Sequence, residues 1–377
     1  AALALVVFGL LAASTAPVSS AAPTVGWDYE VRFDEGFERA HVRLCFRRFL
    51  PKRLVTSHPA AREAFDLSAP AGGASLVRSR DGNSFVPRGL KPGGCLSWSV
   101  DLERLTRSGR RRRPASRVGR DLLVAPGAVM LRPALWTARM HVTVRFVMPE
   151  GYRAAVPWPR TKDGSRYLLD RYELRLESKV AFGRFAVEPL KAAGIVIDGA
   201  VRDAAHRATR AGIRTWIQKA AEAVALLHGR FPAPRLLALV QPVPARDPPV
   251  VFGTAMRGGG AHVRLLLASG AKDEALPGEW VGVHELAHLG MPWTFDTDAW
   301  FQEGFATYYQ EVLRARAGLK TPRQVWQNIH DGFGRGRRSG GERTLAAESA
   351  AMHENHTYHR VYWAGAALAL LLDVELR

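Results

Sequence analysis

The sequence predicts an α+β protein of more than one domain, in which a β-rich, sandwich-like part precedes a part with several helices. Two patterns carry this prediction. Up to about residue 187, short runs that alternate apolar and polar residues are separated by Gly, Pro, Asp and Asn, as between the strands of a sandwich. Beyond about residue 196, longer segments have a helical period. The length of 377 residues accommodates both parts.

The first 22 residues predict a signal peptide. Residues 1–13, AALALVVFGLLAA, form an apolar run shorter than the roughly 20 residues of a spanning helix. Small residues at 19–22 suit a cleavage site, and because the usual Met and basic start are missing, we expect the sequence to begin inside a precursor. An uncleaved signal anchor is the alternative. We expect a secreted or periplasmic protein, with no stable membrane span in the mature chain.

The charge balance is strongly basic. There are 53 Lys and Arg residues against 35 Asp and Glu, which gives a net charge of +18. Such a balance is typical of nucleic-acid binding, but export removes cellular DNA and RNA as partners, and the basic residues are spread along the chain. The densest run, residues 107–120, is expected to be a solvated loop, with a polyanion or lipid-headgroup patch as the alternative. We therefore expect no nucleic-acid partner.

The β-rich part is expected at residues 23–195. Its clearest strand-like runs are residues 27–33, 41–46, 141–148 and 171–178. Cys45, in the second run, and Cys95, in a later run, both lie on the less apolar faces of their expected strands. If those strands are neighbours, an oxidising compartment would allow a disulfide. Two unpaired thiols are the alternative.

The second part is expected at residues 196–377. An apolar stripe predicts a helix within residues 203–230, and two strands follow at 235–243 and 262–269. Further helical segments are expected at 278–289, 299–317, 322–331 and from about residue 358 onward.

A metal-binding motif lies in the segment 278–289. His284 and His288 are four residues apart, so both imidazoles of a helix can reach one Zn²⁺. Glu285 projects beside that metal without ligating it, which is the position of the general base in a zinc protease. A surface helix with two incidental histidines is the alternative.

A catalytic zinc has a third protein ligand, and Glu303 is the candidate. Gly290 and Pro292 end the first helix, and Asp298 can cap a second one that carries Glu303 among bulky apolar neighbours. A carboxylate in such surroundings needs a partner, and a cation held by the first helix would supply it.

The motif HELAH followed by WFQEGFATYY resembles the gluzincins, zinc peptidases of thermolysin-like fold. Within that group, residues 200–377 are similar to the glycyl aminopeptidase family and, more distantly, to the leucyl and alanyl aminopeptidases. The resemblance implies that the β-rich part precedes a gluzincin catalytic domain. It also implies that Tyr362, three residues before Gly365, hydrogen-bonds the oxyanion. These families continue with more helices, so we expect a catalytic domain shortened at its C-terminus.

The sequence departs from the family at Arg257 and Gly258. The aminopeptidases have a glutamate at the position of Arg257, and that glutamate binds the free amine of the substrate. A guanidinium repels an ammonium group and attracts a carboxylate. Arg257 and Gly258 are therefore expected to contact substrate, and an endopeptidase or a preference for acidic side chains becomes more plausible than an exopeptidase.

The sequence thus predicts an exported zinc metallopeptidase that holds one Zn²⁺ per chain through His284, His288 and Glu303. Glu285 is expected to act as general base and Tyr362 as oxyanion donor on a peptide or protein substrate. The alternative is a catalytically inactive binding module with the same fold. The sequence specifies neither side-chain preference nor oligomeric state.

Overall fold

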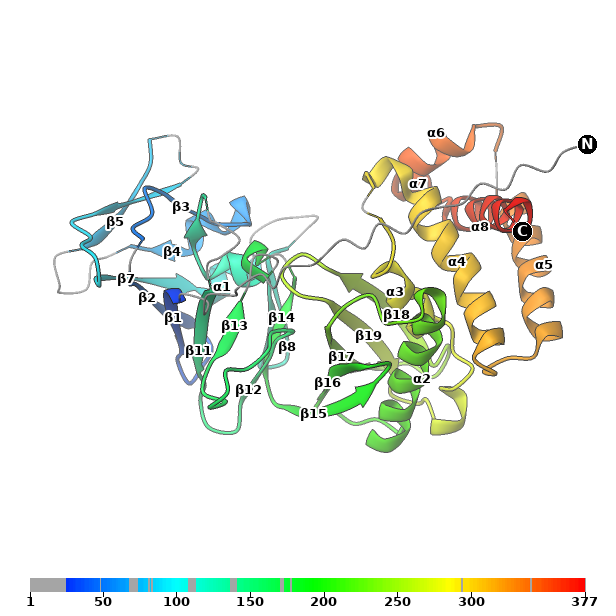
Figure 1. Cartoon of the computed structure of the whole chain (residues 1–377), viewed down its shortest axis with the longest axis horizontal. Coiled ribbons are helices and arrows are strands. Elements are labelled where there is room, and N and C mark those ends of the chain that lie inside the picture. The colour runs from blue at the N-terminus through cyan, green and yellow to red at the C-terminus, as the bar shows by residue number, and fades with distance from the viewer. Residues whose placement is uncertain are drawn as a thin grey trace, which may run out of the picture.

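The computed structural model shows the elements following one another along the long axis of the molecule, from N-terminal sheets to C-terminal helices (Figure 1). It describes residues 25–47, 49–67, 74–80, 82, 84–107, 113–135, 141–169, 173–176, 178–292, 294–339 and 341–376. The predicted signal peptide, residues 1–22, and residues 108–112 of the arginine-rich run lie outside the described residues.

A six-stranded sheet, in the order β13-β11-β1-β2-β7-β4, begins the described fold. Its strands are β1 (Val25–Phe33), β2 (Arg39–Phe46), β4 (Phe65–Asp66), β7 (Cys95–Asp101), β11 (His141–Val147) and β13 (Tyr167–Leu169). The apolar residues of the alternating runs, such as Val42 and Leu44, are buried as their period predicts.

Two four-stranded sheets share a hydrophobic core with the six-stranded sheet. The first contains β10 (Arg132–Pro133), β3 (Leu54–Val55), β6 (Phe85–Arg88) and β5 (Ser75–Arg78). The second contains β12 (Arg153–Ala155), β14 (Val180–Gly183), β9 (Asp121–Val124) and β8 (Ala115–Val118), and helix α1 (Leu102–Arg107) packs nearby. The prediction of N-terminal β-sheets is confirmed.

The two cysteines form a disulfide. Cys45 on β2 and Cys95 on β7 are directly opposite in the antiparallel register, with their Cα atoms 4.0 Å apart. Of the two alternatives that the sequence leaves open, the structure has the disulfide, because the two strands are neighbours.

The predicted strand at residues 171–178 is wrong over its described part. Glu173–Arg175 form a 3-10 turn, η3, and Leu176 has a left-handed backbone with φ 55°. Leu174 and Leu176 still enter the core, which accounts for the alternating pattern. The backbone carbonyls of this segment accept hydrogen bonds from groups that do not belong to a strand. Ser57 Oγ donates to the Arg175 carbonyl, and the Gly127 N–H donates to the Leu176 carbonyl.

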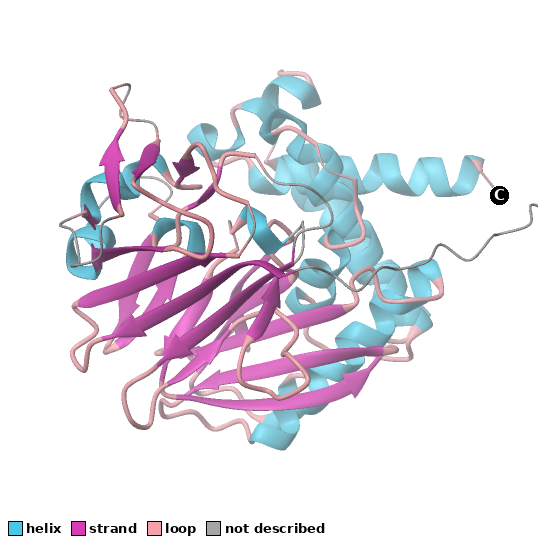
Figure 2. Ribbon diagram, turned by 60° about the vertical axis from the view of Figure 1, so that its left-hand side comes forward, coloured by secondary structure: helices cyan, strands magenta, loops and turns pink. Residues whose placement is uncertain are grey.

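A five-stranded sheet, in the order β15-β16-β17-β19-β18, supports the second part of the chain (Figure 2). Its strands are β15 (Phe185–Ala192), β16 (Ile195–Arg202), β17 (Arg235–Val243), β18 (Val250–Met256) and β19 (His262–Ala268). β17 is parallel to both neighbours, whereas β18 is an antiparallel edge strand. The β15–β16 hairpin spans residue 195, so the boundary predicted there divides one hairpin and stays a prediction.

The two faces of this sheet have different neighbours. Val263 and Leu265 of β19 belong to the core formed with the helices of this second part. Leu237 and Leu239 of β17 instead pack against β9, β12 and β14, so the five-stranded sheet joins the N-terminal sheets through a core of its own.

The helices are α2 (Arg210–His228), α3 (Val281–His288), α4 (Ala299–Arg316), α5 (Pro322–Arg338), α6 (Leu345–Ala350), α7 (Met352–Asn355) and α8 (Tyr358–Glu375). α2 begins at Arg210 because the Thr209 side chain accepts from the Gly212 N–H. α5 continues past its predicted end at residue 331. α6 and α7 were not predicted, since segments of six and four residues carry little periodicity. Among the described residues, none of the helices is both long and apolar enough to cross a membrane.

Candidate metal centre

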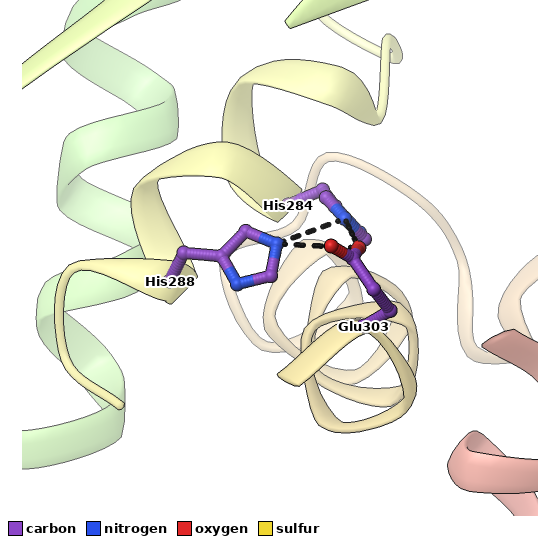
Figure 3. Close-up of side chains that lie close together, drawn as sticks. All are labelled: His284, His288 and Glu303. Atoms are coloured by element: carbon purple, nitrogen blue, oxygen red, sulfur yellow. Dashed lines mark hydrogen bonds and ion pairs between the residues drawn. The ribbon is translucent and has the colours of Figure 1, made fainter. Parts of the chain in front are cut away.

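Helices α3 and α4 bring His284, His288 and Glu303 together (Figure 3). The Nε2 atom of His284 lies 3.2 Å from Glu303 Oε2 and 3.2 Å from His288 Nε2. The third edge of the triangle, from His288 Nε2 to Glu303 Oε2, measures 3.4 Å. The three side chains that the sequence assigns to a metal therefore converge on one point.

The triangle has the dimensions of a tetrahedral zinc site. Zinc bonds of about 2.0–2.1 Å to nitrogen and oxygen, with tetrahedral angles, place ligand atoms about 3.3 Å apart. The observed separations of 3.2–3.4 Å match that spacing. Two imidazoles and a carboxylate are also a donor set that zinc prefers. The residues present therefore fit the ion.

A buried polar network orients the His284 ring through the nitrogen that points away from Glu303 and His288. His284 Nδ1 lies 2.7 Å from Gln310 Oε1, which can only accept, so Nδ1 carries the proton and Nε2 presents its lone pair to the metal point. The Gln310 amide is held in this orientation because its Nε2 donates to Glu311 Oε1 at 3.1 Å.

Glu311 is itself fixed by two donors. The Arg314 guanidinium forms an ion pair with Glu311, and Asn328 Nδ2 donates to it at 3.0 Å. Glu311 and Arg314 are 2% and 3% exposed, so the pair lies almost wholly inside the protein. Sequence reasoning missed this network, although Gln310 is seven residues, or two turns, beyond Glu303 and so shares its helix face.

Glu285 lies between α3 and the edge strand β18. A Cβ on Gly253 would come within 2.5 Å of Glu285 Cγ, so only glycine allows the strand to lie this close to the carboxylate side chain. The Ala255 N–H bonds to the same carboxylate. Burial raises the pKa of Glu285, whereas the neighbouring imidazoles oppose that shift. The carboxylate is thus next to the metal point and to a sheet edge.

Tyr362, in the second turn of α8, completes the site. Its ring stacks on His284 with 6.0 Å between centroids, and its hydroxyl is hydrogen-bonded to Glu303. Burial, together with the Glu303 and Glu285 carboxylates, raises the pKa of the phenol above its usual range. Tyr362 is therefore a neutral hydrogen-bond donor at neutral pH.

Arg257 and Gly258 follow the end of β18. The Arg257 guanidinium donates to the carbonyl of Met291, in the loop that leaves α3, and burial lowers its pKa. The Gly258 carbonyl accepts from both the N–H and the hydroxyl of Ser178. Both residues thus link the strand to neighbouring segments, and their contact with substrate stays a prediction.

The start of α4 differs in one detail from the sequence expectation. The helix does begin after Asp298, but the Asp298 side chain makes no capping hydrogen bond. The Trp300 N–H instead donates to Ser349 Oγ of α6 at 3.0 Å.

One family model matches the region around Glu303. Residues 293–367 match the family model of the M61 glycyl aminopeptidases. The chain resembles the M61 glycyl aminopeptidases. The matched segment contains Glu303 and Tyr362, whereas His284 and His288 precede it. Comparison with curated proteins found no match.

The fold is shared with a solved structure. The crystal structure of an aminopeptidase N family protein from Idiomarina loihiensis is similar over 93% of this chain and 67% of its own, with 16% identity and a TM-score of 0.67. Yeast LTA4 hydrolase in complex with bestatin is similar over 93% of this chain and 58% of its own, with 12% identity and a TM-score of 0.49. N-terminal β-sheets followed by a helical region with a His-His-Glu cluster are the arrangement of the gluzincin peptidases. The M61 match and this cluster together support a zinc metallopeptidase.

Proposed function

We propose that this chain is an exported peptidase that holds one zinc ion per chain and hydrolyses peptide bonds. The observation that carries the proposal is the triangle of His284 Nε2, His288 Nε2 and Glu303 Oε2, with edges of 3.2–3.4 Å. When bound there, zinc supplies a water of lowered pKa and polarises the peptide carbonyl.

The side chains around the triangle supply the rest of the chemistry. Glu285 takes the proton of the attacking water and passes it to the leaving nitrogen, and a raised carboxylate pKa suits a group that must both accept and return a proton. The Tyr362 hydroxyl donates to the oxyanion that forms at the carbonyl. The uncharged phenol can do so because its pKa is raised.

Two further observations support the finer parts of the proposal. The Cys45–Cys95 disulfide is typical of proteins that leave the cytosol, which agrees with the predicted signal peptide. The Arg257 guanidinium, in place of the family's amine-binding glutamate, favours cleavage of internal bonds or acidic substrates over removal of N-terminal residues.

The deciding experiment measures metal content and cleavage together. We expect about one zinc per chain and chelator-sensitive cleavage of a peptide library, with Glu285→Gln retaining zinc and losing turnover. N-acetylated and free peptides, compared at equal concentration, distinguish internal cleavage from exopeptidase action. Bound zinc without cleavage of any library member would instead establish the inactive binding module.

A further inference from the structure

Four basic side chains gather where the five-stranded sheet meets the N-terminal sheets. His262 and Arg264 come from β19, Lys179 immediately precedes β14, and His58 lies in the loop after β3. On β19, Val263 and Leu265 face the helices, so His262 and Arg264 face the other way. The cluster is therefore separated from Glu285 by the sheet itself.

Hydrogen bonds from Ser178 hold this junction together. Its N–H and its hydroxyl donate to the Gly258 carbonyl at 2.5 and 2.7 Å, and the hydroxyl also lies 2.9 Å from the Gly260 carbonyl. Lys179 is the next residue, and the His262 ring is bonded to the same Gly260 carbonyl. The backbone thus brings Lys179 and His262 to one place.

The positive charge of the cluster has no counter-charge among the described residues. Burial lowers the pKa of His262 most, and Lys179 and Arg264 lower it further, to about 4. Burial and then Lys179 lower the pKa of His58, and burial and then Arg264 lower that of Lys179. Among the residues that the structure describes, no carboxylate acts on any of these groups. The Arg264 guanidinium donates to a neutral acceptor, Gln241 Oε1, at 2.8 Å.

Two buried nitrogens in the cluster also have no hydrogen-bond partner within the part of the chain that the structure describes. His262 is 2% exposed and its Nδ1 is unpaired, as is the Nε2 of His58. An unsatisfied buried polar atom costs about 1–3 kcal/mol. A water molecule would satisfy such a nitrogen and leave the charge uncompensated, whereas an anion would meet both needs.

We propose that His58, Lys179, His262 and Arg264 form a binding site for a small inorganic anion between the N-terminal sheets and the five-stranded sheet. Lys179 and Arg264 balance the charge of the anion. The two imidazoles donate hydrogen bonds to it, and the anion favours the protonated ring of His262. Peptide hydrolysis does not require this site, so its occupancy can be tested whatever the activity of the metal centre.

The probe is inorganic sulfate, titrated into the full chain at constant ionic strength in a chloride-free buffer. We expect saturable binding of one sulfate per chain by calorimetry. Lys179→Met and Arg264→Gln should each weaken it by about tenfold or more. Lys191→Met, an exposed lysine on β15, is the matched control and should bind as the unmodified chain does. Chloride and phosphate, titrated in the same way, show which inorganic anion binds most tightly.

Thermal unfolding provides a second measurement of sulfate binding, independent of the heat of binding that calorimetry records. Sulfate stabilises most proteins gradually by exclusion from their surface, so the specific effect must saturate. Without sulfate, Lys179→Met should unfold at a higher temperature than the unmodified chain, because it removes an uncompensated, half-buried charge. At saturating sulfate this order should reverse. Equal, unsaturated shifts in the unmodified chain, both cluster variants and the control would overturn the proposal.

Discussion

Gly304 and Gly365 meet backbone to backbone where α4 crosses α8. A Cβ on Gly304 would lie 2.4 Å from the Cα of Gly365, and a Cβ on Gly365 would lie 2.1 Å from the carbonyl oxygen of Trp300. Gly304 follows the candidate ligand Glu303, and Gly365 lies one turn after Tyr362. The absence of both side chains therefore allows the Tyr362 phenol to reach Glu303.

Gly365→Ala should separate these helices. The added methyl overlaps backbone, which cannot move aside as a flexible side chain would, and we expect a loss of about 1–3 kcal/mol in the free energy of unfolding. Denaturant unfolding measures the loss. Gly334→Ala on α5 is the control, since its nearest neighbour is the end of the Arg338 side chain at 3.2 Å. Equal stability of the two variants would contradict the close crossing.

Gln310→Leu should weaken zinc binding by about 10- to 100-fold, because His284 Nδ1 loses the acceptor that fixes its tautomer. Competition with a chromophoric chelator measures this change. Gln327→Leu, at an exposed position of α5, should leave zinc affinity unchanged. If Gln310→Leu binds zinc as tightly as the unmodified chain, the amide does not orient the ligand.

Tyr362→Phe tests the oxyanion donor of the proposed peptidase. Removal of one such hydroxyl should lower kcat by about 10²–10³-fold, with little change in KM or in zinc content. Steady-state kinetics and metal analysis on the same preparation give both quantities. A variant with unchanged kcat would leave Tyr362 a packing residue beside His284.

Glu279 should make stability depend on pH. Burial raises the pKa of this carboxyl, which is 6% exposed, from 4.5 to about 7. Since the folded state keeps the proton more firmly, the stabilisation is present below pH 4.5 and is lost as the pH rises through 7, by up to about 3 kcal/mol.

Glu279→Gln should remove this loss. Urea unfolding of the metal-free chain between pH 4.5 and 8, with chelator present, compares the variant with the unmodified protein. Glu222→Gln, an exposed change on α2, is the control and should keep the pH dependence. The same slope in all three chains would show that Glu279 does not carry it.

The sequence was sufficient to identify the three side chains of the candidate metal site because its signals are local. His284 and His288 share a helix face by their spacing, and Glu303 stands out as a carboxylate in an apolar helix. The position of Tyr362 came from a family resemblance. The strand predicted at residues 171–178 was wrong because the alternating pattern there had another cause. Leu174 and Leu176 are buried, but their segment does not pair with a strand.

The remaining features depend on contacts between distant segments. Gln310 is visible as a residue two turns after Glu303, but its role requires knowing that α4 packs against α3. Lys179 and His262 are 83 residues apart in the sequence and meet only because the two sheets pack together. The periodicity of the sequence does not predict contacts of this kind between distant segments.

The bonds that Ser178 and Trp158 make to the glycine turn after β18 bear on dissection of the molecule. Ser178 binds the carbonyls of Gly258 and Gly260, and Trp158 Nε1 donates to that of Gly259 at 2.8 Å. The edge strand beside Glu285 is therefore anchored at its end by the β-rich part. A fragment that keeps only the helices and the five-stranded sheet would retain His284, His288 and Glu303 and still lack the hydrogen bonds that fix the end of this strand. We therefore expect the β-rich part to be needed for an intact site.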